Sequence, residues 1–396
     1  MPDSTFTILA VTTGRPGLAP MLASLQRELD PTGDHVLLLH DGPATPETRA
    51  LWESVALPGR FIELTDGPHR DWGHTPRNRH LPDCRGDWIM HLDDDDVLAP
   101  GALACLRPAA NAASSPGHPP VLLIPRMVDG LGNRVWTKPR FVEGQVGTGN
   151  LVHPSRIFLG RFGLRYGGDF DFATSLLAAN PGLEVRFLPE STYLVRPHLS
   201  PVKPAFRDLA KFPGDLGRED FQGGWQRTLA TKLTRGDWLD IGAGLGHSRS
   251  RIAAAGHRVT LHDVAPGLPV DLTCPLAAIT DHSAGIVSAF DVLEHVAEDV
   301  EFLAHLVRIA RRAVVITTPN IWVSHCANPH HVREYSPPLL AHRLLEQPGI
   351  NRLDLFTGDP QGRRIAKADW SHWNQTPSPQ LGAIAWKTSS RLSDVP

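Results

Sequence analysis

Short apolar runs alternate with amphipathic stretches of helical length along most of this chain. The first runs are FTILAVTT, HVLLLHDG and RFIELTDG, and helical patterns at residues 18–29 and 46–55 separate them. Because parallel strands need crossover helices, this β-α-β-α-β rhythm predicts a parallel sheet covered by helices. A further buried strand is predicted at residues 88–92, and the apolar LACL stretch after Pro100 favours a helix.

The alternation stops at a proline-broken stretch, RPHLSPVKPAF, and then begins again. Prolines at this spacing predict an exit from a first domain. We therefore expect domains at residues 1–203 and 204–396, with a linker and lead-in helix at about 200–228. The second rhythm comprises DWLDIGAG, a helix through Ile252, RVTLHD, GIVSAFDV, a helix near residues 300–310, AVVITTPN, NRLDLFTG and GAIAWKTS.

Length and composition limit the possible classes of protein. A chain of 396 residues is too long for one ordinary domain. Its formal net charge of -3 argues against a nucleic-acid-binding surface. The apolar runs are too short to span a bilayer, and we expect no signal peptide. Without C-x-x-C spacing, neither disulfides nor a zinc site are expected, which fits a reducing cytoplasm; the cysteines are Cys84, Cys105, Cys274 and Cys326.

Four consecutive aspartates, Asp93 to Asp96, follow the predicted strand at residues 88–92. Adjacent carboxylates repel one another and raise each other's pKa values. A divalent cation would relieve this repulsion, because Mg²⁺ and Mn²⁺ prefer oxygen ligands and often keep phosphate oxygens in their shell. Alternatively, the run is the acidic start of the following helix.

The longer stretch PRNRHLPDCRGDWIMHLDDDDVLAPGAL resembles the family 2 glycosyltransferases of the GT-A fold. In that family an Arg-Asn pair and a Gly-acid-aromatic step precede a strand that ends in D-x-D-D. The resemblance covers roughly residues 5–200 and implies a nucleotide-sugar donor with a divalent metal, Mn²⁺ or Mg²⁺. It implies that Asp93 contacts the donor ribose and that Asp95 ligates the metal.

The same resemblance implies further donor-site residues. Asp41 would hold the nucleotide base, and the loop at Thr12 and Thr13 would surround the nucleotide. The expected donor-nucleotide-binding residues are thus Thr12, Thr13, Asp41, Arg77, Asn78 and Asp93. LVRPHLS resembles the family's Tyr-Arg-x-His segment, so His198 is a candidate metal or diphosphate ligand, with a structural role as the alternative.

Glycosyl transfer with inversion needs a base that deprotonates the acceptor hydroxyl. The stretch RYGGDFDFATSLL matches the place of the family's base, just before a helix. The resemblance therefore assigns the base to Asp169, with Asp171 as second choice. The alternative for Asp169 is an N-cap of that helix.

A glycine-rich turn, LDIGAGLG, opens the second rhythm. Its glycines permit a tight turn and close approach of a ligand to the backbone. The spacing is G-x-G-x-G rather than the G-x-G-x-x-G of dinucleotide-binding folds. Asp263 ends the next predicted strand, where an acid can bind both ribose hydroxyls, although a turn residue is the alternative.

Together with FDVLEHV, VVITTPN and HHVREYSPPLL, this turn resembles class I S-adenosylmethionine-dependent methyltransferases, especially their small-molecule O-methyltransferase branch. The resemblance covers roughly residues 220–390. The residues it implies for S-adenosylmethionine binding are Asp240, Gly242, Ala243, Gly244, Gly246, Asp263, Asp271 and Asp291. Asp271 would face the adenine, although the segment from Asp263 to Asp271 is too short for the usual helix.

Methyl transfer to a hydroxyl gains from a base whose pKa is near neutral, and histidine suits that role. His295 and His331 follow predicted strands at the substrate end and are candidate bases, with a structural role as the alternative for each. Near the end of the chain, Trp370, Ser371, His372 and Trp373 either stack on a sugar face or pack in the core.

The expected fold class is α/β in two domains. The first is a GT-A (nucleotide-diphospho-sugar transferase, Rossmann-like) domain, and the second is a Rossmann-like class I methyltransferase domain. The expected function is cytoplasmic, bifunctional glycan or polysaccharide modification by glycosyl transfer and O-methylation. The alternatives are a glycan-binding first domain that serves a methyltransferase, a nucleic-acid base modifier, and a dehydrogenase in the second half. The oligomeric state is left open.

Overall fold

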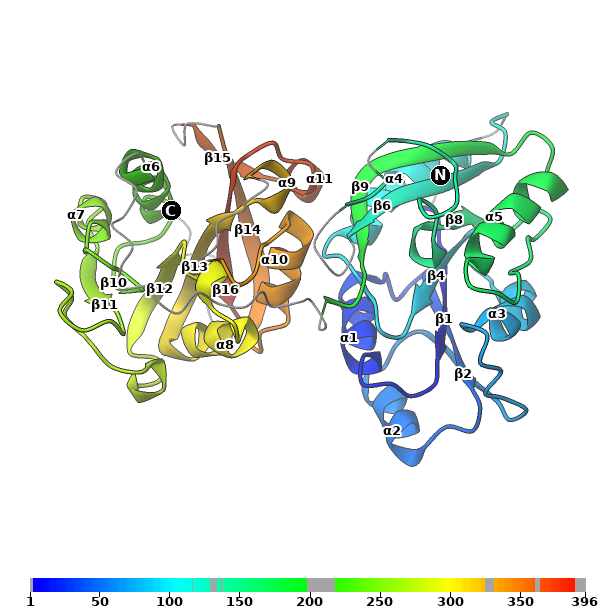
Figure 1. Ribbon diagram of the computed structural model, residues 1–396, viewed down its shortest axis with the longest axis horizontal. Helices are drawn as coiled ribbons and strands as arrows, with labels where there is room; N and C mark the ends of the chain where they lie inside the picture. The colour runs from blue at the N-terminus through cyan, green and yellow to red at the C-terminus, as the bar shows by residue number, and fades with distance from the viewer. Residues whose placement is uncertain are drawn as a thin grey trace. The chain divides into compact units, whose positions relative to one another are not determined.

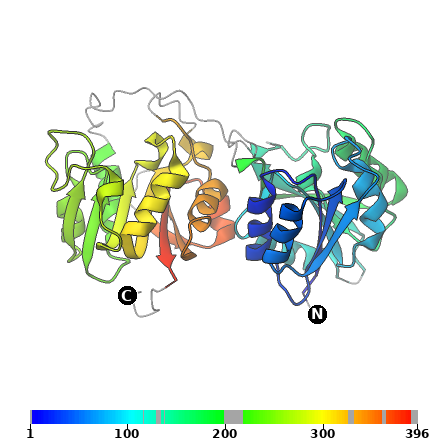
Figure 2. The same ribbon diagram turned by 90° about the horizontal axis from the view of Figure 1, so that it is seen from below.

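The computed structural model describes residues 3–115, 117–128, 134–136, 138–197, 218–324, 331–359 and 364–388. The chain forms two compact units, Met1–Ser200 and Pro201–Pro396, each with its own sheet between helices (Figures 1 and 2). The predicted two-domain α/β class is confirmed. The predicted boundary at residues 203/204 lies outside the described residues.

The first sheet is built around β1 (Phe6–Thr12). The chain moves outward from β1 through parallel β2 (His35–Asp41) to β3 (Gly59–Leu64). It then crosses to the other side of β1 in β4 (Trp88–Asp93), which is also parallel. Where the strand order reverses in this way, the carboxyl ends of the two central strands border a crevice. The ends of β1 and β4 therefore mark the ligand edge of this unit.

The sheet continues beyond β4 in mixed directions, in the order β8-β6-β9-β5, with β7 paired to β6. The hydrophobic pattern did not predict these strands, which are β5 (Val97–Leu98), β6 (Val121–Val128), β7 (Arg134–Val135), β8 (Val152–Pro154) and β9 (Glu184–Leu194). Three of them, β5, β7 and β8, are only two or three residues long and carry too few positions to show a period. The other two, β6 and β9, are of ordinary length and were missed all the same.

Helices cover both faces of this sheet because alternate strand residues point to opposite sides. Ile8 and Ala10 of β1 face the core under α1 and α4, whereas Leu9 faces the core under α5. The helices are α1 (Leu18–Glu28), α2 (Pro46–Ser54), α3 (His74–His80), α4 (Ala102–Ala113) and α5 (Gly168–Ala179).

The second sheet has the order β11-β10-β12-β13-β16-β14-β15. Its first four strands are parallel, and β16 runs antiparallel between β13 and β14. The strands are β10 (Asp237–Ile241), β11 (Arg258–His262), β12 (Ala284–Phe290), β13 (Ala310–Pro319), β14 (Ile350–Gly358), β15 (Ile365–Ala368) and β16 (Gln380–Lys387). The strand order reverses at β10, so the carboxyl ends of β10 and β12 border the crevice.

Two helical layers enclose this second sheet. Trp225 and Leu229 of α6 pack on one face, and Leu303 of α8 with Leu340 of α10 pack on the other. The helices are α6 (Arg218–Ala230), α7 (Ser248–Ala253), α8 (Asp299–Ile309), α9 (Ile321–Ser324), α10 (Pro337–Leu345) and α11 (Trp370–Asn374). Among the described residues, no helix combines the length and apolarity needed to cross a bilayer.

Two fully buried histidines lie side by side in the first unit. The Nε2 atoms of His91 on β4 and His153 on β8 are 3.2 Å apart, and the two imidazole rings stack on each other. Phe162 meets the ring of His91 edge-on, and the ring of Phe172 is tilted against that of His153. Burial lowers the pKa of His153 to about 4 and also lowers that of His91. Both rings are therefore neutral in the folded protein at pH 7.

This pair makes the first unit sensitive to acid. An unfolded histidine titrates near 6.5, so between pH 6.5 and about 4 the unfolded state binds more protons than the folded state. The free energy of unfolding therefore decreases as the pH falls, by up to about 1.4 kcal/mol for each unit of pKa difference. Urea unfolding at pH 7 and pH 5 should show a smaller loss for His153→Leu than for wild type. An equal loss in both proteins would contradict this origin of the acid sensitivity.

Candidate active sites

The aspartate run lies in a turn at the ligand edge of the first sheet. Asp93 ends β4, and the backbone N–H of Asp96 donates to the carbonyl of Asp93 at 3.2 Å. The following helix begins later, after Gly101, so the alternative of an acidic helix start is wrong. Asp94, Asp95 and Asp96 are buried. Burial, followed by the charges of Asp93 and Asp95, raises the pKa of Asp96 to about 8.

Asp94 joins the aspartate run to the loop after β1. Its carboxylate accepts hydrogen bonds from the Thr12 hydroxyl at 2.7 Å, the Thr13 backbone N–H at 3.3 Å and the Arg15 Nε at 2.8 Å. The two loop threonines predicted for the donor site therefore lie beside the acids. A Cβ on Gly17 would lie 2.7 Å from the Asp94 carbonyl oxygen, so only glycine fits there.

Two arginines converge on the predicted metal ligand. Asp95 Oδ2 lies 3.0 Å from Arg15 Nη1 and 3.0 Å from Arg196 Nε. Both guanidinium side chains are about half exposed, with 49% and 57% of their surface accessible, so they can move away from Asp95. A carboxylate among acids fits a divalent cation, and two arginines fit phosphate oxygens. His198 lies outside the described residues.

Arg77 lies beneath the predicted donor site. It is fully buried, and its Nη2 is 2.5 Å from Asp93 Oδ1 and 2.9 Å from the carbonyl of Leu92. It therefore fixes the carboxylate predicted to contact the ribose. Asn78 hydrogen-bonds both backbone groups of Phe162, at 2.9 and 2.8 Å, and so holds the chain that leads into α5.

Asp41 ends β2 at the same edge of the sheet. Its Oδ2 accepts the His69 backbone N–H at 3.0 Å, and its Oδ1 lies 2.5 Å from His69 Nδ1. This hydrogen bond raises the pKa of His69. The predicted base-binding acid is thus oriented by a neighbouring imidazole, which the sequence analysis did not identify.

The predicted base, Asp169, lies in the first turn of α5. The N-cap is Gly167, so the alternative of an N-cap at Asp169 is wrong. Asp169 accepts the backbone N–H groups of Thr148 at 3.1 Å and Phe170 at 2.8 Å. Burial raises its pKa, and the charges of His74 and Asp93 also act on it. The Asp169 carboxylate is therefore within range of the charge of Asp93 at the end of β4.

Asp171, the second choice for the base, is bound in a different way. Arg165 binds it bidentately, with Nε–Oδ2 and Nη2–Oδ1 distances of 2.8 and 2.7 Å. Asp171 is thus held in an ion pair, whereas Asp169 accepts backbone N–H groups.

An exposed aromatic pair lies near Asp169. The ring centroids of Trp72 and Tyr166 are 6.1 Å apart, and 58% of Trp72 and 81% of Tyr166 is accessible to solvent. Trp72 also lies 6.2 Å from the ring of His74. The sequence analysis missed this pair, because isolated aromatic residues outside a periodic pattern give no signal of exposure.

The glycine turn of the second unit follows β10. Gly242, Gly244 and Gly246 all have left-handed φ values, of 69°, 52° and 76°. A Cβ on Gly242 would lie 2.6 Å from Val292, whereas a Cβ on Gly244 would meet nothing within 4 Å. Gly242 therefore serves packing, and Gly244 leaves its face open to a ligand.

The predicted ribose ligand lies against this turn. Asp263 Oδ2 accepts the Gly244 N–H at 3.0 Å, and its Oδ1 accepts the Ala265 N–H at 2.9 Å. The neighbouring Ala243 N–H donates to the His262 carbonyl at 3.0 Å. Asp263 thus shapes a turn and also borders the glycine loop.

Two other predicted cofactor residues have structural partners. Asp240 is buried, and each of its carboxylate oxygens accepts a serine hydroxyl at 2.5 Å, from Ser248 and Ser288. Burial raises its pKa to about 6. Asp271 accepts the Leu261 N–H at 2.7 Å and Arg249 Nη2 at 2.6 Å. Asp240 therefore supports the loop from beneath, and Asp271 fastens the short segment after β11 to that strand.

Asp291 follows β12 with a left-handed φ of 56°. Its carboxylate accepts Gln222 Nε2 of α6 at 2.7 Å and the Thr317 hydroxyl of β13 at 2.9 Å, and it also binds Gln380 of β16. An aspartate in this conformation is uncommon, and such backbone strain gathers at functional sites.

The two candidate bases of the second unit lie together. The ring centroids of His295 and His331 are 4.9 Å apart. Glu294 lies beside them. Each of the three residues offers one atom that could bind a metal, and these three atoms lie within 4.8 Å of one another. Glu294 and His331 are buried. The sequence analysis missed Glu294, although it stands directly before His295 in FDVLEHV.

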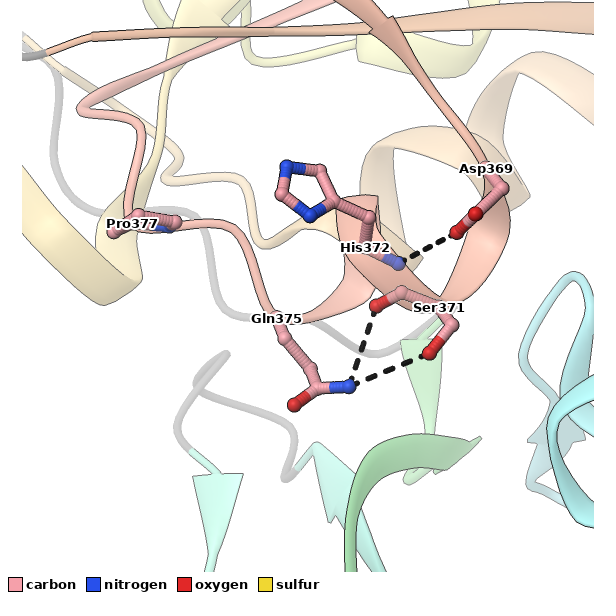
Figure 3. A pocket seen from close by; sticks show the side chains of 5 residues that line it. All are labelled: Asp369, Ser371, His372, Gln375 and Pro377. Carbon is pink, nitrogen blue, oxygen red and sulfur yellow. Dashed lines mark hydrogen bonds between the residues drawn. The ribbon is translucent and has the colours of Figure 1, made fainter.

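Of the tail residues, Trp373 is in the core, where its indole N–H donates to the Phe356 carbonyl at 3.1 Å. Core packing is therefore confirmed for this residue. Ser371 and His372 line a hollow of about 370 Å³ together with Asp369, Gln375 and Pro377 (Figure 3). The Asp369 carboxylate accepts the His372 backbone N–H at 2.8 Å and caps α11.

The edge of the first sheet thus gathers acids, arginines and loop threonines between β1 and β4. Residues 8–135 match glycosyl transferase family 2. This match confirms the resemblance predicted for the first half. No curated protein matches the chain in sequence.

Solved structures similar to the chain fall into two groups. Staphylococcus aureus TarS 1-349, which has also been solved with UDP, is 15% identical; the alignment covers 57% of this chain and 64% of TarS 1-349, with a TM-score of 0.39. SAM-dependent methyltransferases from Thermotoga maritima and Archaeoglobus fulgidus are 12% and 17% identical. These alignments cover 43% of this chain and 91% and 98% of those chains, with TM-scores of 0.34 and 0.35.

Proposed function

We propose that the chain is a bifunctional glycan-modifying enzyme. The first unit transfers a sugar, with inversion, from a nucleotide sugar to an acceptor hydroxyl, and the second methylates an oxygen with S-adenosylmethionine. The observation that carries this proposal is the position of the predicted acids and glycines, which gather where each sheet reverses its strand order.

In the first unit the chain's own groups divide the work. Asp93, held by Arg77, receives the ribose, and Asp41 receives the base. Arg15 and Arg196 bind diphosphate oxygens once they leave Asp95. A divalent cation at Asp95 would supply charge stabilisation for the departing diphosphate.

Asp169 accepts the proton of the acceptor hydroxyl. The acceptor oxygen then forms a bond to the anomeric carbon on the face opposite the diphosphate, whose bond to that carbon breaks. Burial of Asp169 raises its pKa and makes it a better base than an exposed aspartate. The exposed rings of Trp72 and Tyr166 offer a surface on which an acceptor sugar stacks.

The two acids of α5 form a matched pair for testing this mechanism. Asp169→Asn should lower the rate of glycosyl transfer by about 10²–10⁴-fold, because it removes the base. Asp171→Asn should have little effect on transfer, because water screens the ion pair that Asp171 forms with the exposed Arg165. Transfer is measured with a panel of nucleotide sugars in Mn²⁺, with Asp95→Ala as the donor-site control. Equal losses in both variants would refute the assignment of the base.

The open face of Gly244 carries the proposal for the second unit. The sulfonium cofactor would supply the methyl group there. Asp263 lies beside it and has remaining acceptor capacity for ribose hydroxyls, since each carboxylate oxygen can accept more than one hydrogen bond.

Two glycine variants separate cofactor binding from folding. Gly244→Ala leaves neighbouring atoms undisturbed and should cost about 1–2 kcal/mol of backbone strain while its methyl group blocks the cofactor. Gly242→Ala has the same type of strain plus a clash with Val292 and should destabilise the unit more strongly. Thermal shift with S-adenosylhomocysteine is the measurement. We expect Gly244→Ala to fold but to lose the shift; a full wild-type shift would exclude a cofactor at this face.

A shared product is the second part of the proposal, and it is motivated by the covalent linkage of the two units, which raises effective concentration. With an unglycosylated acceptor, nucleotide sugar and labelled S-adenosylmethionine, wild type should transfer label to the glycan. Asp95→Ala should transfer none unless glycosylated product is supplied. If Asp95→Ala labelled the glycan as strongly as wild type without added glycosylated product, methylation would not depend on glycosyl transfer, and the proposal of a shared product would be wrong.

A further inference from the structure

Glu294, His295 and His331 form a compact cluster at the carboxyl edge of the second sheet. Glu294 and His295 belong to the short turn after β12, and His331 precedes α10. Backbone hydrogen bonds hold these two segments together, because the N–H groups of Val332 and Arg333 donate to the Glu294 carbonyl at 2.8 and 3.2 Å. The closeness of the three side chains is therefore built into the backbone.

We propose that these three residues bind a divalent transition-metal ion. They offer two imidazole nitrogens and one carboxylate oxygen, and one such atom from each lies within 4.8 Å of the others. Two histidines and one glutamate form a known catalytic zinc ligand set, which leaves a coordination position for a further ligand. The same donor types also suit iron(II), manganese and cobalt. Mg²⁺, which prefers oxygen ligands, fits the aspartate run of the first unit better.

The surroundings orient these ligands as in metal centres. The Thr318 hydroxyl donates to Glu294 Oε2 at 3.0 Å, and Glu334 Oε1 lies 3.2 Å from His331 Nδ1. A carboxylate that hydrogen-bonds a ligating histidine fixes the ring and increases its basicity. Glu294 is 1% exposed, and a bound cation would offset the cost of burying its charge.

The position of the site gives it a role at the acceptor end. Glu294 follows Asp291 by three residues, at the edge where β12 and β13 end. An open coordination position there suits an oxygen ligand such as an acceptor hydroxyl. His295 and His331 then serve as ligands rather than as two separate bases. The metal site itself does not depend on the identity of the methyl donor.

Zinc titration of the full-length chain tests the site. The protein is stripped with EDTA and titrated with Zn²⁺ by calorimetry in an Asp95→Ala background, which removes the predicted metal ligand of the first unit. We expect one Zn²⁺ per chain, and at least about 100-fold weaker binding in His331→Ala and Glu294→Gln, the upper end of the losses seen for residues that only support ligands. His305→Ala, a histidine of α8 outside the cluster, is the matched control and should bind like its parent.

Two further variants keep the test decisive. His295→Ala changes a partly exposed ligand and should also lose Zn²⁺ if His331→Ala proves unstable. Glu334→Gln should weaken binding by about 10–100-fold through the orientation of His331. Unchanged Zn²⁺ affinity in His295→Ala and Glu294→Gln would overturn the site. S-adenosylhomocysteine binding, measured in the same proteins, reports separately on the proposed methyltransferase function.

Discussion

A buried carboxylate that ties a loop to the carboxyl end of a parallel strand is the constraint on which each unit depends. In the first unit Asp94 binds Thr12, Thr13 and Arg15 of the loop after β1. In the second unit Asp240 binds the hydroxyls of Ser248 and Ser288, beneath the glycine turn. A buried charge is costly unless it is hydrogen-bonded, so these contacts fix the position of both loops.

Asp94 and Asp240 have structural roles, so a ligand would meet the residues beside them. Within the aspartate run, Asp94 binds the loop after β1. Asp93 and Asp95 instead pair with arginines at the edge of the sheet. Asp240 supports the turn in the same manner, and above it the face of Gly244 is open and the side chain of Asp263 borders the turn. In both units, one buried acid thus holds a loop at the carboxyl edge of the sheet.

The neighbouring aspartates of the first unit influence the pKa of Asp96. The pKa of Asp96 is raised mainly by burial, and the smaller part of the shift comes from the excess of negative charge that Asp93 and Asp95 supply. Cations relieve this excess, and Arg15 and Arg196 already lie against Asp95. The same field reaches Asp169, whose pKa is raised by burial and by the charge of Asp93. The charge at this edge thus acts both on the predicted metal ligand and on the predicted base.

The sequence by itself determined the two α/β rhythms, the aspartates after β4 and the glycines after β10, because period and spacing are local properties. The choice of Asp169 as a candidate base came from the family resemblance. Only the tertiary structure decided what these residues contact. It separated Asp169 from Asp171 through the pairing of the latter with Arg165. It placed Arg77 under Asp93 and brought His331 to Glu294 and His295. The short strands that complete the first sheet were also beyond the pattern. Hydrogen bonds and burial bring together residues that are far apart in the chain. A local pattern of apolar positions contains no information about such contacts.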